Sequence, residues 1–155
     1  MYPEIPFTIG FAFDPNLTRV LLIKKARGPL FNIGKWNGIG GKFNLGEGIR
    51  ACMRREFLEE TGIDTDETDW NIYHIEHHLA LEEQKLNPRL YFLTTQLTKE
   101  KFNSYKSMTD ELVTDTPIDW VLDDIYRESY VYNLPYLVAM ARTWLRHPKH
   151  RWIEG

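Results

Sequence analysis

The sequence has a single cysteine, no long apolar run and no excess of basic charge. Cys52 stands alone among 155 residues, so no disulfide forms within the chain, and a reducing compartment is the simpler assumption. No stretch approaches the length of a membrane span, and no signal-peptide core follows a basic start. A formal net charge of -3 argues against a protein that mainly coats nucleic acid. We therefore expect a cytoplasmic protein.

The composition that remains is typical of a globular domain. The chain is 43% hydrophobic and 14% aromatic, and its charged residues are spread along the sequence instead of gathering in a tail. A length of 155 residues suits one domain better than two. The sequence therefore predicts one domain over residues 1–155.

Strand-like and helix-like segments alternate, which favours an α/β fold. A helix over residues 47–61 has apolar residues at helical spacing and no proline, and Gly62 follows it as a left-handed end. The other predicted elements are a hairpin of strands 7–13 and 20–23, a glycine-rich loop 28–41, strands 72–81 and 90–97 around a turn at Asn87 and Pro88, a strand 118–122, a helix 134–145 and a basic tail 146–151.

The predicted helix 47–61 carries three glutamates on one arc. At about 100° per residue, Glu56, Glu59 and Glu60 share this arc with the apolar side chains of Cys52 and Met53. Like charges beside apolar groups either take up protons or bind a counter-cation. Carboxylate oxygens suit Mg²⁺ or Mn²⁺, and the sequence offers no nearby cysteine or histidine pair at zinc spacing. The alternative is an ordinary solvated helix face.

Glycines just before this helix favour the metal interpretation. Gly38, Gly40 and Gly41 allow the backbone to approach a ligand closely and to present its amide and carbonyl groups. Lys42 follows at once and is a candidate for binding a phosphate. A phosphate-bearing substrate and a divalent cation are thus predicted at the same place.

These features together resemble the Nudix box. Gly41, Glu47 and the run of residues 55–63 fill every fixed position of that motif across residues 41–63, with Phe57 where an aliphatic residue is more usual. The resemblance implies a Nudix hydrolase with an α/β/α sandwich, in which a mixed β-sheet lies between helices. It also implies a magnesium-dependent enzyme, with manganese as an alternative ion, that cleaves a diphosphate linkage by attack of water at phosphorus.

The resemblance assigns roles to residues of the box. It implies that Glu56, Glu59 and Glu60 bind the metal together with the carbonyl of Gly40. It further implies that Arg55 orients a glutamate and that Glu59 or Glu56 acts as the general base. Supporting roles fall to Gly41, Glu47 and Gly62.

Many members of this family take a further acidic ligand from outside the box. The acidic residues in a suitable region are Glu111, Asp115 and Asp119, with Asp110 as a weaker candidate. Each one alone reads as a solvated loop carboxylate. We predict Glu111 and Asp115 jointly as metal ligands.

The segments 19–25 and 35–42 resemble the MutT-like branch that cleans oxidised purine nucleoside triphosphates, and its animal members in particular. The candidate substrate-binding residues are Thr8, Lys25, Trp36, Asn37, Lys42 and Tyr130, with Phe31 as a further stacking candidate. Core packing is the alternative for the three aromatic residues. In those animal enzymes a tryptophan and paired aspartates precede the last helix, where this chain has the run Arg-Glu-Ser-Tyr at 127–130.

The leading hypothesis is a pyrophosphatase that converts a nucleoside triphosphate, with purine deoxynucleotides such as 8-oxo-dGTP favoured, into a monophosphate and pyrophosphate. The alternative within the family is a hydrolase of a nucleoside diphosphate linked to another group, such as ADP-ribose or a dinucleotide. An alternative from another class is a Nudix domain that binds a nucleotide or RNA without catalysis, which the basic tail would favour. The expected partner is a small nucleotide, without a stable nucleic-acid complex or a membrane.

Overall fold

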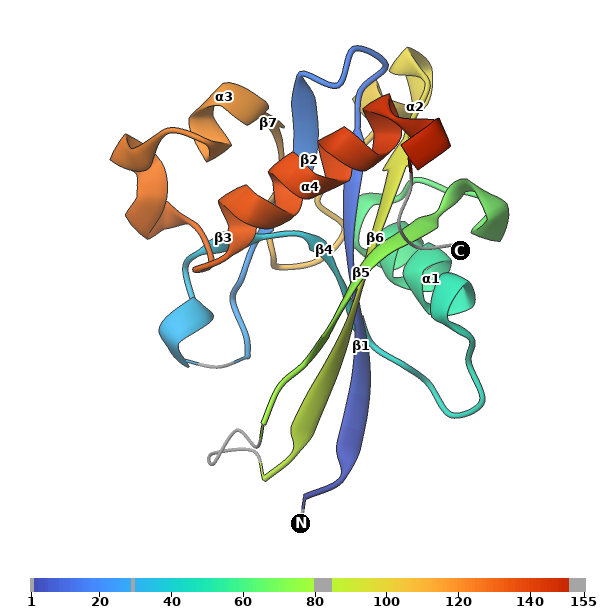
Figure 1. The fold of residues 1–155 in the computed structure, drawn as a ribbon, viewed down its shortest axis with the longest axis vertical. Coiled ribbons are helices and arrows are strands. Elements are labelled where there is room, and N and C mark those ends of the chain that lie inside the picture. Colours follow the sequence, from blue (N-terminus) through green and yellow to red (C-terminus); the bar gives the residue numbers. More distant parts are fainter. Residues whose placement is uncertain (1, 29, 80–84, 151–155) are drawn as a thin grey trace.

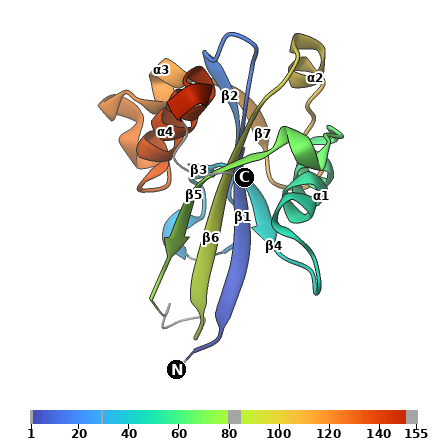
Figure 2. The same ribbon diagram turned by 45° about the vertical axis from the view of Figure 1, so that its right-hand side comes forward.

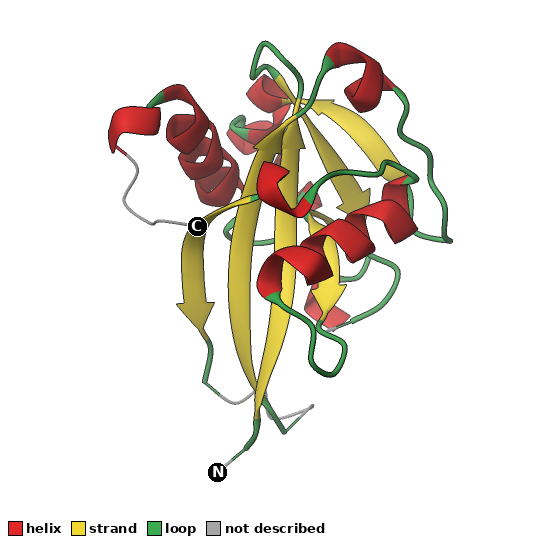
Figure 3. Cartoon of the chain, turned by 90° about the vertical axis from the view of Figure 1, so that its right-hand side faces the viewer, coloured by secondary structure: helices red, strands yellow, loops and turns green. Residues whose placement is uncertain are grey.

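A mixed β-sheet between helices forms the framework of the molecule (Figures 1 and 3). The computed structural model describes residues 2–28, 30–79 and 85–150. Within them the strands are β1 (Glu4–Phe13), β2 (Arg19–Lys24), β3 (Trp36–Asn37), β4 (Ile39–Lys42), β5 (Asn71–His77), β6 (Asn87–Gln96) and β7 (Val113–Pro117). The helices are α1 (Ile49–Thr61), α2 (Lys99–Asn103), α3 (Ile118–Val121) and α4 (Leu134–Arg146). Short 3-10 helices are η1 (Leu30–Asn32), η2 (Glu67–Asp69), η3 (Asp124–Ser129) and η4 (Pro148–His150).

The main path of the sheet runs β3-β2-β1-β6-β5, with β4 added to β1 and β7 added to β2. β1 pairs with β6 in parallel, and the other strand pairs are antiparallel. Along its length β1 changes its antiparallel partner, from β2 at Phe13 to β4 between Phe7 and Gly10. The sheet therefore splits beside β1, and the chain crosses this split at Gly38, between β3 and β4.

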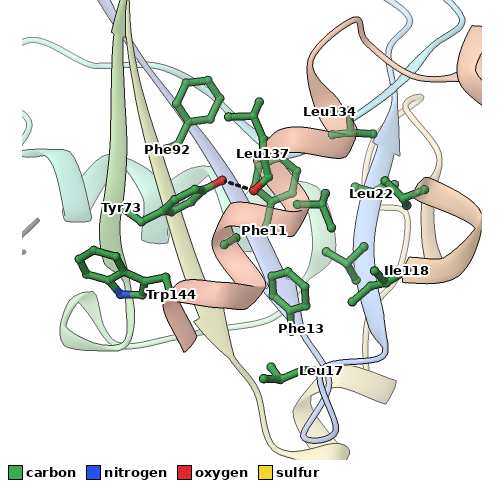
Figure 4. Packing of buried hydrophobic residues seen from close by; sticks show 14 of the residues in the cluster. Phe11, Phe13, Leu17, Leu22, Tyr73, Phe92, Ile118, Leu134, Leu137 and Trp144 are labelled. Atoms are coloured by element: carbon green, nitrogen blue, oxygen red, sulfur yellow. Dashed lines mark hydrogen bonds between the residues drawn. The ribbon is translucent and has the colours of Figure 1, made fainter. Parts of the chain in front are cut away.

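Helices α1 and α4 cover opposite faces of the sheet (Figure 2). Because strand side chains alternate, Phe11 and Phe13 of β1 point toward α4 while Ala12 points toward α1. On the α4 side the phenol of Tyr73 donates a hydrogen bond to the carbonyl of Leu137 at 2.9 Å (Figure 4). Each face of the sheet thus has its own hydrophobic core.

Gly10 shows how closely α1 packs on the sheet. A Cβ atom at Gly10 would lie 2.5 Å from the terminal methyl of Met53 on α1 and 3.0 Å from the ring of Trp70. The missing side chain gives Met53 its space, and Met53 is fully buried. This contact fixes the helix that carries the glutamates against the middle of β1.

The structure confirms the predicted α/β sandwich and most of the predicted elements. The hairpin of residues 7–13 and 20–23 corresponds to β1 and β2, and both long helices lie within two residues of their predicted bounds. The predicted strand 72–81 corresponds to β5, which ends at His77; residues 80–81 lie outside the described part of the chain. The predicted tail continues to residue 151, which also lies outside it.

The prediction of a strand at 118–122 is wrong, because these residues form α3. Ile118 and Val121 are both buried, and their spacing of three residues suits one face of a helix as well as a short strand. The strand at this place is β7, which precedes it and ends at Pro117. Its polar, β-branched sequence hides it from a search for apolar alternation.

The predicted turn at Asn87 and Pro88 is also wrong, because both residues belong to β6 and pair with the start of β1. Pro88 is tolerated because it lies next to the first residue of the strand, and its carbonyl still accepts from the N–H of His78 at 2.8 Å. The glycine-rich loop 28–41 likewise contains η1, β3 and most of β4.

Candidate active site around α1

Helix α1 presents Glu56, Glu59 and Glu60 beside β4 and β1. Its buried residues are Cys52, Met53, Phe57 and Thr61. The helix ends at Gly62, whose φ of 76° is left-handed and whose N–H donates to the carbonyl of Leu58 at 2.9 Å. The predicted helix and its glycine end are confirmed.

The three glutamates do not share one environment. The side chain of Glu56 is 13% exposed and Glu60 is half-buried, whereas the side chain of Glu59 is 53% exposed. The prediction that all three lean inward is therefore wrong for Glu59. The buried stripe of α1 follows Met53 and Phe57, which leaves Glu59 beyond its edge.

Arg55 holds the carboxylates of this region together. Its Nε donates to Glu47 at 2.7 Å, and its Nη1 donates to Glu56 at 2.9 Å and to Glu59 at 3.2 Å. Its Nη2 donates to Glu47 at 2.9 Å and to the carbonyl of Lys42 at 3.0 Å. The side chain thus ties β4, the loop after it and α1 to one another.

Charge and burial shift the pKa values of these groups in opposite directions. Hydrogen bonding to Arg55 lowers the pKa of Glu47 to about 2, so Glu47 is a permanent anion near neutral pH. Burial raises the pKa of Glu56, against the opposing hydrogen bond from Arg55, and the nearby charges of Glu59 and Glu60 raise it further. Burial is also the main cause of the raised pKa of Glu60. Glu56 and Glu60 therefore keep their charges most easily when a cation lies beside them.

Two adjacent glycines of β4 make this packing possible. A Cβ atom at Gly41 would lie 2.5 Å from Oε1 of Glu56, and one at Gly40 would lie 1.9 Å from the carbonyl oxygen of Thr8. Thr8 itself is 1% exposed, and its hydroxyl lies 3.5 Å from the carbonyl of Gly41 and 3.4 Å from the sulfur of Cys52. The structure thus places Thr8 inside the contact between β1, β4 and α1.

Glu111 lies close to the carboxyl end of α1. It is 3% exposed, and its carboxylate accepts from the backbone N–H of Ala26 at 2.6 Å and lies 3.5 Å from Nζ of Lys25. Its charge also raises the pKa of Glu60, and that of Lys25 lowers it, so the three groups interact. The predicted ligand Glu111 and the predicted substrate-binding residue Lys25 therefore lie near Glu60 of the box.

Asp115 does not join them. It lies in β7, and Nε of Arg19 on β2 donates to its carboxylate at 2.5 Å. Asp110, the weaker candidate, forms an exposed ion pair with Arg27 at 2.7 Å. Asp119 is exposed on α3. Of the two acidic residues predicted jointly as ligands outside the box, Glu111 lies near Glu60, whereas Asp115 pairs with Arg19.

The candidate base-binding residues fall into two groups. Trp36 and Tyr130 come together, because β3 bridges to Tyr130 and the N–H of Val131 donates to the carbonyl of Trp36 at 3.0 Å. Tyr130 is 5% exposed and belongs to the core below α4, which matches the core-packing alternative. Phe31 on η1 is 63% exposed. The aromatic side chain offered to solvent is thus Phe31, while Trp36 is half-buried.

Asn37 and Lys42 keep polar groups near the split in the sheet. Oδ1 of Asn37 accepts from the N–H of Gly38 at 2.8 Å, in the bend between β3 and β4. Lys42 ends β4 with an exposed side chain, while its carbonyl is held by Arg55.

Thr109 is a residue of this site that sequence reasoning missed. Its hydroxyl donates to Oε2 of Glu60 at 3.0 Å and accepts from the N–H of Glu111 at 3.1 Å. The signal available in the sequence was weak, namely a hydroxyl residue two positions before the acidic candidate Glu111. Nothing in that spacing reveals that the loop returns to α1.

The donor set suits a hard divalent cation by its chemistry. The oxygens come from half-buried carboxylates whose pKa values are raised by burial and by one another. Over residues 2–28, 30–79 and 85–150, however, no three His, Cys, Asp or Glu side chains already surround a common point. The glutamates fit such an ion once their flexible side chains turn toward it, and Arg55 now occupies part of their hydrogen-bonding capacity.

Comparison with known proteins identifies the class of this site. The family model described as NUDIX domain matches residues 7–113, which include the whole box and Glu111. The chain belongs to the NUDIX domain family. No helix within the described residues is long and apolar enough to cross a membrane.

Known relatives agree with this membership. The oxidized purine nucleoside triphosphate hydrolase of Danio rerio is 56% identical over 66 residues, which cover 43% of this chain and 40% of that protein. The match thus spans less than half the length of that relative. A MutT NUDIX hydrolase from Burkholderia pseudomallei has a similar fold, with a TM-score of 0.68 at 16% identity over 88% of this chain and 97% of that one. The NUDIX domain of Shewanella oneidensis NrtR, solved with ADP ribose, gives a TM-score of 0.64 at 14% identity over 94% and 89%.

Proposed function

We propose that this protein is a divalent-metal-dependent hydrolase that converts a purine nucleoside triphosphate into a nucleoside monophosphate and pyrophosphate. We propose that residues 1–155 act as one domain in this role. The single cysteine, buried on α1, favours a reducing compartment, and we place the enzyme in the cytoplasm.

The observation that carries this proposal is the pair of half-buried carboxylates Glu56 and Glu60. Burial makes their charges costly, and it raises the pKa values of both groups. Ionisable groups whose pKa values are shifted by burial and by neighbouring charges are concentrated at functional sites. A phosphoryl substrate with its cation is the partner that relieves this cost most directly.

Residues of α1 and the neighbouring loop would hold the ion. Glu56, Glu59 and Glu60 would supply carboxylate oxygens, Gly40 of β4 a carbonyl, and the buried Glu111 a further carboxylate. When bound, Mg²⁺ or Mn²⁺ would lower the pKa of water and neutralise phosphoryl oxygens. We leave Asp115 out of this set because it pairs with Arg19 of β2, whereas the charge of Glu111 acts on Glu60.

The other side chains bind, orient and transfer a proton. Lys25 and Lys42 attract the phosphates, and Arg55 orients Glu56 and Glu59 through its Nη1. Water attacks one phosphorus, the bond from that phosphorus to the leaving oxygen breaks, and a carboxylate accepts the proton of the water. Glu59 or Glu56 is the acceptor: Glu59 is open to solvent, and Glu56 is the more buried base.

The choice of a purine triphosphate rests on similarity to relatives. The matching segment of the Danio rerio protein, whose name specifies oxidised purine triphosphates, supports such a substrate. Tyr130 of the run 127–130 is buried and Phe31 is exposed, so we assign the stacking contact to Phe31 instead of Tyr130. Phe31, Trp36 and Asn37 are the base contacts we propose.

A second candidate is a hydrolase of a linked nucleoside diphosphate. The solved NrtR domain has the same fold and contains ADP ribose, which favours testing this substrate class. Its reaction would give two phosphate-bearing fragments instead of pyrophosphate. The products therefore distinguish the two candidates.

The test is product analysis by chromatography after incubation with Mg²⁺ and a panel of normal and oxidised nucleoside triphosphates, ADP-ribose and dinucleotides. A variant that combines Glu59→Gln and Glu60→Gln is the inactive reference, and Glu100→Gln on the exposed face of α2 is the matched control. We expect monophosphate and pyrophosphate, lost in the first variant and kept in the second. Cleavage of the linked diphosphates alone would favour the second candidate, and no turnover at all would favour nucleotide binding without catalysis.

A further inference from the structure

The loop between α2 and β7 is fastened to the carboxyl end of α1. The N–H of Lys106 donates to the carbonyl of Thr61 at 2.9 Å, and the N–H of Met108 donates to the carbonyl of Glu60 at 3.2 Å. These bonds satisfy carbonyl groups that the last turn of a helix leaves without partners. They also fix the backbone immediately before Thr109 relative to Glu60.

The far side of the same loop is anchored as well. The buried carboxylate of Glu111 accepts from the backbone N–H groups of Ala26 at 2.6 Å and Arg27 at 3.4 Å. The N–H of Val113 donates to the hydroxyl of Ser107 at 2.9 Å. Thr109 is therefore held between α1 and the loop that follows β2, although its own side chain is exposed.

The hydroxyl of Thr109 has only one way to satisfy both of its partners. A backbone N–H can only donate, so the hydroxyl accepts from Glu111 N, at 3.1 Å. Its single hydrogen is then free to point at Oε2 of Glu60, at 3.0 Å. This bond fixes the position of one carboxylate oxygen of Glu60 relative to the loop.

We propose that Thr109 is a positioning residue for Glu60: the backbone of Glu111 orients its hydroxyl, and the hydroxyl holds the Glu60 carboxylate in place for a divalent cation. This inference rests on the proposed function, because it assumes that Glu60 binds the ion. Thr109 touches neither substrate nor metal in this scheme and acts through Glu60 alone.

The test is Mn²⁺ binding to the nucleotide-free protein, followed by electron paramagnetic resonance. Thr109→Val removes the hydroxyl at nearly constant volume, and Thr109→Ser restores it. Thr68→Val, at an exposed threonine of η2, is the matched control. Melting temperatures of all variants show whether any change in affinity reflects folding.

We expect Thr109→Val to weaken Mn²⁺ binding about tenfold, which is about 1.4 kcal/mol, with an unchanged melting temperature. Thr109→Ser and Thr68→Val should bind within about twofold of the parent. Equal binding by Thr109→Val and the parent, or equally weak binding by Thr109→Ser and Thr109→Val, would overturn the role of Thr109 alone. A parent whose Mn²⁺ binding does not weaken in Glu60→Gln would overturn the proposed function together with this inference.

Discussion

The ion pair between Arg55 and Glu47 should stabilise the protein in a pH-dependent way. The perturbation is Glu47→Gln, which keeps the shape of the side chain and removes its charge. A pKa lowered from 4.5 to about 2 corresponds to about 3.5 kcal/mol at about 1.4 kcal/mol per pKa unit. Because this pair lies near the surface, solvent screening reduces the expected loss to about 1–2 kcal/mol.

The sign of the pH dependence follows from the lowered pKa. The folded state binds the proton of Glu47 less readily than the unfolded state, so the stabilisation is fully present above the unfolded pKa of 4.5. It decreases as the pH falls below that value and is lost as the pH falls through the folded pKa of about 2. The difference in stability between the parent and Glu47→Gln should therefore be constant near neutral pH and shrink in acid.

Urea unfolding followed by circular dichroism at several pH values measures this difference. Glu59→Gln is the matched control, because Glu59 contacts the same arginine but its side chain is 53% exposed, so its loss should change stability by less than about 0.5 kcal/mol. A Glu47→Gln loss that stays constant down to about pH 3 would refute the electrostatic reasoning. So would equal effects of the two substitutions.

Three further substitutions test separate parts of the account. Asp115→Asn should leave turnover within about twofold of the parent, since its carboxylate serves an ion pair and no metal; a steady-state assay measures this, and a large loss would return Asp115 to the site. Gly41→Ala should lower turnover at least about tenfold with little change in melting temperature, because its Cβ would displace the flexible carboxylate of Glu56; unchanged turnover would contradict this packing. Tyr73→Phe should lower the free energy of unfolding by about 1 kcal/mol through the lost hydrogen bond to Leu137, measured by urea unfolding, and a neutral effect would argue against that bond.

The sequence was informative where local chemistry decides the structure. Helix α1 could be predicted because its apolar spacing, its lack of proline and Gly62 all agree. The box glutamates could be placed on this helix for the same reason. The long strands β1 and β6 could also be recognised from their apolar runs.

Features that depend on tertiary contacts escaped prediction. β4 looks like a flexible loop because of Gly40 and Gly41, yet these glycines are present because β1 and Glu56 approach so closely. The exposure of Glu59 depends on where the centre of the buried face falls, which periodicity alone locates only coarsely. Asp115 was predicted as a ligand from its place in the sequence. In the structure it pairs with the guanidinium of Arg19, which lies on β2.

Thr109 illustrates the same limit within the site itself. Its role depends on a loop that returns to the last turn of α1 through two backbone hydrogen bonds. Backbone bonds carry no signature in residue types, so a sequence search sees only an exposed threonine. Functional side chains held by such loops are found only when the fold is known.

The central claim is that the glutamates of α1 catalyse hydrolysis of a nucleotide with a divalent cation. Its most direct test compares the Mg²⁺-dependent turnover of one purine deoxynucleoside triphosphate by the parent, Glu60→Gln and the control Glu100→Gln. We predict a fall in kcat/KM of at least about 100-fold for Glu60→Gln, no change for Glu100→Gln, and unchanged melting temperatures. Turnover by Glu60→Gln at the rate of the parent would contradict the claim.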